Sequence, residues 1–167
     1  MIKHQISPAA ARAGDNAERH RLTASSVVVI EDDDDIRALI GTVLGRAGMT
    51  VHTASTAGDG IALATRLRPD IVTIDIGLPD ADGLDVAAFL RDLSTMRDVP
   101  ILMISANAQD SQAERARARG AEAYLSKPFR PRTLRAKVAE LLGMTDEALD
   151  PSTTPRRPAS LTGATRY

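Results

Sequence analysis

The sequence predicts an α/β fold in which a doubly wound parallel sheet carries helices on both faces. Short runs rich in β-branched residues alternate along the chain with longer segments of helical apolar spacing, a pattern typical of parallel strands joined by crossover helices. Three runs are almost continuously apolar, as expected for strands buried on both faces. The five predicted strands lie near residues 27–30, 50–54, 71–74, 100–104 and 123–125.

The first predicted helix begins after Asp33 or Asp34, because acidic residues at a helix N-terminus cap free amides and complement the helix dipole. Gly48 is well placed to end it. Apolar residues at helical spacing between these points are Ile36, Leu39, Ile40, Val43, Leu44 and Ala47.

The next two helices are predicted over 57–66 and 83–93, each with one apolar face. The residues expected to point inward are Ile61, Ala64 and Leu67 in the former, and Val86, Phe89, Leu90 and Leu93 in the latter.

The fourth helix, 109–119, is the weakest prediction, since only Ala113 and Ala116 are obvious inward residues. The fifth begins at Pro131, a residue favoured in the first helical turn. Its expected inward residues are Leu134, Val138, Leu141 and Leu142.

Residues 25–142 therefore form the predicted domain. The segments 1–24 and 143–167 are polar, and the latter contains three prolines. We expect both to be disordered, because neither can bury enough apolar surface to offset its ordering entropy. The C-terminal segment is also too short for an output domain, so no DNA-binding activity is expected.

Composition excludes several classes of function. The chain has no cysteine, so disulfides and thiolate metal sites are absent. With 21 basic and 22 acidic residues, its net charge of −1 provides no overall attraction to nucleic acid or membrane. No secretory signal or apolar run of about 20 residues is present. These observations favour a cytoplasmic protein.

Polar side chains follow four of the predicted strands. Asp75 follows the third strand, Glu31 and Asp32 follow the first, Ser105 the fourth and Lys127 the fifth. The carboxyl ends of parallel strands share one edge of the sheet, where ligands bind in open α/β folds. Three carboxylates, a hydroxyl and an ammonium at that edge can hold a divalent cation and a phosphoryl group together.

This arrangement resembles the receiver domain of two-component response regulators. The resemblance implies a (βα)5 flavodoxin-like fold with five parallel strands in the order 2-1-3-4-5. The stretches that carry it are VIEDD at 29–33, PDIVTIDIGLP at 69–79, DGL at 82–84, PILMISA at 100–106 and GAEAYLSKPF at 120–129.

The resemblance also implies roles for the acidic residues. Asp75 would be the phosphoacceptor, since a carboxylate can form an aspartyl phosphate. Glu31, Asp32, Asp75 and the backbone carbonyl of Gly77 would bind Mg²⁺. Glutamate at position 31 departs from the commoner aspartate, which lengthens one arm of the site and keeps its charge. Asp33 to Asp35 are better explained as helix-capping residues than as ligands.

The remaining roles concern the phosphoryl group and the switch. Lys127, aimed by a cis peptide bond to Pro128, would pair with Asp75 and then with the phosphoryl group. Ser105 would donate a hydrogen bond to a phosphoryl oxygen. Tyr124 would be a switch residue that follows Ser105, although a half-buried strand aromatic with a solvated hydroxyl explains it equally well.

The expected function is a stand-alone response regulator that accepts a phosphoryl group from a histidine kinase or a histidine phosphotransfer protein. It would signal by protein contact or pass the group onward, and would not be an enzyme in the ordinary sense. The alternative is a pseudo-receiver, a protein-binding module that phosphate does not regulate. A phosphatase of the haloacid dehalogenase type is disfavoured, because Gly77 stands where a second aspartate would be needed.

The expected output surface comprises the fourth helix, the fifth strand and the fifth helix. It is basic, with Arg115, Arg117 and Arg119 on the fourth helix, so an acidic partner or a second copy could bind it; simple solvation of the arginines is equally compatible. The chain is expected to be a monomer or a phosphorylation-dependent dimer. Ala123 disfavours the symmetric dimer of DNA-binding regulators, which often has an acidic residue there.

Overall fold

The computed structural model describes residues 25–106 and 110–144. They form a five-stranded parallel sheet in the order β2-β1-β3-β4-β5, which confirms the predicted topology. The strands are β1 (Ser26–Ile30), β2 (Thr50–Ala54), β3 (Ile71–Asp75), β4 (Ile101–Ser105) and β5 (Ala123–Ser126).

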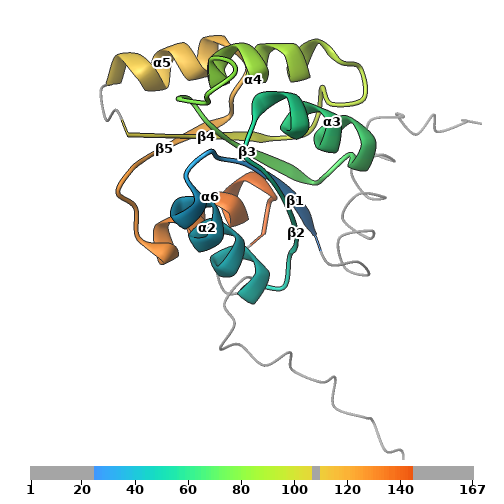
Figure 1. Cartoon of the computed structure of the whole chain (residues 1–167). Coiled ribbons are helices and arrows are strands. Elements are labelled where there is room, and N and C mark those ends of the chain that lie inside the picture. Colours follow the sequence, from blue (N-terminus) through green and yellow to red (C-terminus); the bar gives the residue numbers. More distant parts are fainter. Residues whose placement is uncertain (1–24, 107–109, 145–167) are drawn as a thin grey trace, which may run out of the picture.

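Five helices cover the two faces of this sheet (Figure 1). They are α2 (Asp34–Arg46), α3 (Ala57–Leu67), α4 (Gly83–Asp92), α5 (Asp110–Ala118) and α6 (Pro131–Leu141). Helices α3, α4 and α5 pack on one face over an apolar cluster that includes Val28 and Ile74. Helices α2 and α6 pack on the other, over a cluster that includes Val29 and Ile104. None of the described helices is long and apolar enough to cross a membrane.

The helix ends follow the capping chemistry expected from the sequence. Asp33 Oδ1 accepts hydrogen bonds from the amides of Asp35 at 3.0 Å and Ile36 at 2.9 Å, so Asp33 is the N-cap of α2. Gly48, which follows the end of this helix, has a φ of +87°, a conformation that glycine adopts without strain. Both predictions are confirmed.

Two of the residues expected to point inward are exposed. Leu67 is 37% exposed because it lies at the last turn of α3, where Arg68 turns the chain out of the helix with a left-handed conformation. Phe89 is 50% exposed because the buried face of α4 is set by Leu84, Ala87 and Leu90, which leaves position 89 on the solvent side. The inward assignment of these two residues was wrong.

Candidate functional site

The carboxyl edge of the sheet gathers the polar residues that follow the strands. Glu31 comes directly after β1, while Asp75 and Ser105 are the last residues of β3 and β4. All three are buried, with 1%, 6% and 7% of their surface exposed. Lys127 follows β5 and reaches over the same edge. The structure therefore brings together side chains that are up to 96 residues apart in the sequence.

Lys127 is the central cation of this group. Its Nζ lies 2.9 Å from Asp75 Oδ1, and it lies 2.9 Å from Oε1 and 2.8 Å from Oε2 of Glu31. The other oxygen of Asp75, Oδ2, accepts a hydrogen bond from the amide of Gly77 at 2.9 Å. The peptide bond between Lys127 and Pro128 is cis. Both oxygens of Asp75 are thus held in fixed directions by donors.

Burial and charge shift the pKa values in this cluster. Burial raises the pKa of Glu31 and the charge of Asp75 adds to the effect, while the ammonium of Lys127 opposes it. Burial alone would lower the pKa of Lys127, but its hydrogen bonds to Glu31 and Asp75 outweigh this and raise it. Lys127 is therefore firmly charged, and Glu31 is a carboxylate whose charge the site only partly compensates.

The acidic residues fit a divalent cation. One carboxylate oxygen each from Glu31, Asp32 and Asp75 lies within 4.8 Å of the others. Glu31 Oε2 is buried and lacks a hydrogen bond of acceptable geometry, although Lys127 Nζ is close to it. Asp32 is exposed, so the group opens to solvent. Hard oxygen donors with one open side suit Mg²⁺, which keeps several water ligands.

The predicted switch residues have well-defined positions. Ser105 ends β4, and its carbonyl accepts a hydrogen bond from the amide of Lys127 at 2.7 Å. Tyr124 is half-buried on β5, opposite Met103, and packs against the apolar cluster under α3, α4 and α5. This position is compatible with Tyr124 as a switch residue and with Tyr124 as an ordinary half-buried strand aromatic, so its part in a switch stays a prediction.

Sequence reasoning missed two residues that hold the backbone around the site. Arg37 Nη1 donates to the carbonyls of Glu31 at 2.9 Å and Asp32 at 3.2 Å. A basic residue so near the N-terminus of a helix opposes the dipole, and this could have indicated a specific contact. Asp80 accepts hydrogen bonds from the amides of Ala57 at 2.8 Å and Gly58 at 3.0 Å.

A family model and curated relatives agree with this geometry. The model of the response regulator receiver domain matches residues 27–139. The chain is 38% identical over 114 residues to the KDP operon transcriptional regulatory protein KdpE of Escherichia coli K12, covering 68% of this chain and 49% of KdpE. It is 33% identical over 104 residues to the polar-differentiation response regulator DivK of Brucella anthropi, covering 62% of this chain and 85% of DivK.

Solved structures show the same fold. Chemotaxis response regulator CheY4 of Vibrio cholerae superposes with a TM-score of 0.69 at 28% identity, covering 71% of this chain and 99% of CheY4. A second match is the receiver domain of sensor histidine kinase PA1611 from Pseudomonas aeruginosa, solved with a magnesium ion in its active-site cleft. It has a TM-score of 0.67 at 26% identity, covering 72% of this chain and 99% of the PA1611 domain.

The curated relatives and the family model match this chain over different lengths. The chain spans about half the length of KdpE and of the next transcriptional regulators that it matches. The family model, in contrast, covers most of the chain, including β1 from its second residue, the four other strands and the edge that gathers Glu31, Asp75 and Lys127. The chain belongs to the response regulator receiver domain family of two-component signalling.

Proposed function

We propose that this receiver is switched by phosphorylation of Asp75, with the phosphoryl group taken from a phosphohistidine of a histidine kinase or a histidine phosphotransfer protein. The observation that carries the proposal is the ammonium of Lys127, placed 2.9 Å from Asp75 Oδ1 and 2.8 Å from Glu31 Oε2 beside the exposed Asp32. This set can compensate the charge of both the acceptor and an incoming phosphoryl group.

The residues suit an in-line transfer that depends on positioning and charge compensation. An oxygen of Asp75 would form the new P–O bond while the P–N bond to the donor imidazole breaks. Lys127 would stabilise the negative charge on the transferred group, and the Ser105 hydroxyl would donate to one of its oxygens. Mg²⁺ held by Glu31, Asp32, Asp75 and the Gly77 carbonyl would neutralise carboxylate and phosphoryl charge.

Acetyl phosphate provides the direct test. In the presence of Mg²⁺ the protein is expected to gain the mass of one phosphoryl group, in an acid-stable and hydroxylamine-labile linkage. Asp75→Ala should abolish the gain and EDTA should suppress it, whereas Asp98→Asn, in an exposed loop, should be labelled normally. Full labelling of Asp75→Ala would refute the assignment. Failure of the unsubstituted protein to label would favour the pseudo-receiver.

The output is proposed to be a contact with another protein or onward phosphotransfer in the cytoplasm. The match over 85% of DivK supports a stand-alone receiver, while the transcriptional regulators match over about half of their length. Affinity purification with and without beryllofluoride, followed by identification of the bound proteins, would test this. Proteins retained equally under both conditions would speak against a phosphorylation-dependent output.

A further inference from the structure

Arg37 contacts the backbone of both residues of the acidic pair. Its Nη1 donates to the carbonyl oxygens of Glu31 at 2.9 Å and Asp32 at 3.2 Å, and its Nη2 forms an ion pair with Asp34. The side chain is 21% exposed, so most of it is packed against the protein. One guanidinium thus joins the end of β1 to the first turn of α2.

The two carbonyls lie in a short segment between sheet and helix. The Glu31 amide donates to Ala54 at 3.0 Å, which is a sheet contact. The carbonyl of Asp33 accepts a hydrogen bond from the amide of Arg37 at 2.8 Å, which has the spacing of an α-helical hydrogen bond. Between these points the chain turns, and the orientation of the two peptide units determines where the carboxylates of Glu31 and Asp32 point.

We propose that Arg37 is a positioning residue for cation binding: by holding both carbonyls, it fixes the directions in which the carboxylates of Glu31 and Asp32 leave the backbone. The inference deepens the proposed function and rests on its Mg²⁺ site. The partners that orient metal ligands commonly change metal affinity by about 10-fold or more when they are removed.

The sign of the effect separates positioning from charge. A positive charge near a cation site repels the cation, so loss of the Arg37 charge alone would strengthen Mg²⁺ binding. Loss of positioning would weaken it. The ion pair with Asp34, which is 86% exposed, contributes little in either case because solvent screens it.

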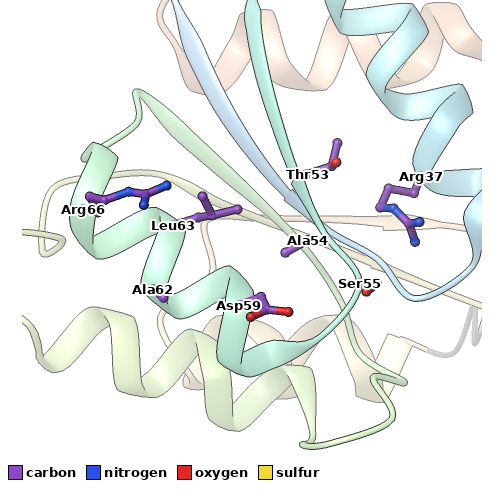
Figure 2. A pocket seen from close by; sticks show the side chains of 8 residues that line it. All are labelled: Arg37, Thr53, Ala54, Ser55, Asp59, Ala62, Leu63 and Arg66. Carbon is purple, nitrogen blue, oxygen red and sulfur yellow. The ribbon is translucent and has the colours of Figure 1, made fainter.

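The surroundings of Arg37 allow its replacement. It lines a hollow of about 480 Å³ beside the edge strand β2, across that strand from Asp59 and Arg66 of α3 (Figure 2). The hollow is open to solvent on this side of the molecule. A shorter or uncharged side chain at position 37 therefore leaves no closed cavity in the core.

The test compares Mg²⁺ affinities in the full chain without a phosphoryl donor. NMR titration would follow the amides of Glu31, Asp32 and Asp75 in Arg37→Met and Arg37→Lys, with Asp34→Asn and Arg46→Met as matched controls.

We expect Arg37→Met to bind Mg²⁺ about 10-fold more weakly. Arg37→Lys keeps the charge but loses the planar fork, so it should also bind more weakly. Both controls should stay within about twofold of the unsubstituted protein.

The amides of Glu31 and Asp32 provide a second measurement in the absence of Mg²⁺. They should shift in both Arg37 variants, while amides of β4 and β5 stay in place, which also reports whether each variant is folded. If Arg37→Met does not fold, Arg37→Lys decides the outcome. Mg²⁺ affinity that is unchanged or increased in the folded variants overturns the role of Arg37 while leaving the Mg²⁺ site intact. Absence of Mg²⁺ binding by the unsubstituted chain overturns the site, and this inference with it.

Discussion

A single ammonium group forms ion pairs with two buried carboxylates at the carboxyl edge of the sheet. Lys127 pairs with Glu31 and Asp75, while Asp32 lies exposed beside them. Burial, together with the charge of Asp75, raises the pKa of Glu31, so its charged form costs free energy in the folded protein when no cation is bound. A cation that binds only the folded state would offset this cost, which links Mg²⁺ binding to stability.

Glu31→Gln is therefore expected to raise the urea midpoint of the cation-free protein at pH 7 and to reduce its stabilisation by Mg²⁺. When folding raises the pKa of a carboxyl, the group contributes most to the free energy of unfolding below its ordinary pKa of 4.5, where it is protonated. This contribution is lost as the pH rises through the folded pKa. The difference between the variant and the unsubstituted protein should thus shrink below pH 4.5. Urea unfolding curves of both proteins at pH 7 and below pH 4.5, with EDTA or with Mg²⁺, measure this difference in stability. An unchanged response to Mg²⁺ would contradict the role of Glu31 as a ligand.

At the scale of elements, the loop between β3 and α4 is fastened at several points. Asp80 caps the N-terminus of α3, and Asp82 caps α4 through the amide of Leu84 at 2.8 Å. The amide of Gly83 donates to the carbonyl of Ile76 at 2.9 Å, and a Cβ on Gly83 would lie 2.0 Å from the carbonyl oxygen of Asp75. The loop that carries Gly77 is therefore held against both helices and β3.

Asp80→Ala should release this loop from α3. We expect a modest loss of stability from the missing cap. Mg²⁺ binding should also weaken, because the Gly77 carbonyl, a proposed ligand, loses its support. Asp59→Ala is the matched control, since Asp59 lies in the first turn of α3 and accepts a hydrogen bond from the hydroxyl of Thr56, the N-cap of the same helix. Calorimetric Mg²⁺ titration of both variants measures the difference. An equal loss of affinity in the two variants would show that only helix stability matters.

The elements were predictable from the sequence because their signals are local. The five strands, the Asp33 cap and the Gly48 terminus follow from neighbouring residues, and the order of the strands followed from the resemblance of the motifs. Arg37 and Asp80 were missed for a different reason. Asp80 contacts residues 22 and 23 positions earlier in the chain. The charge of Arg37 in the first turn of α2 could have indicated a contact, but its partners are backbone carbonyl oxygens, which the side-chain pattern does not identify.

At the scale of the whole molecule, α5 is more firmly fastened than its few apolar residues indicated. Arg91 of α4 donates to the carbonyl of Gly120 at 2.7 Å and to Glu122 at 2.7 Å, just beyond the end of α5. Arg119 pairs with Asp85 of α4 at 2.7 Å, so one arginine of the predicted output surface is already neutralised. These contacts tie the C-terminal end of α5 to α4.

Any movement of α5 on phosphorylation should therefore be a pivot about its C-terminal end. Beryllofluoride and Mg²⁺ are expected to shift the amides of residues 110–114 more than those of 117–122, because Arg91 holds the latter. In Arg91→Met the shifts should extend through 117–122, whereas Arg46→Met on α2 should leave the pattern unchanged. Heteronuclear NMR spectra of the three proteins, with and without beryllofluoride, measure this. If no amide in residues 110–125 moves while those around Asp75 do, the surface formed by α5, β5 and α6 is not the output.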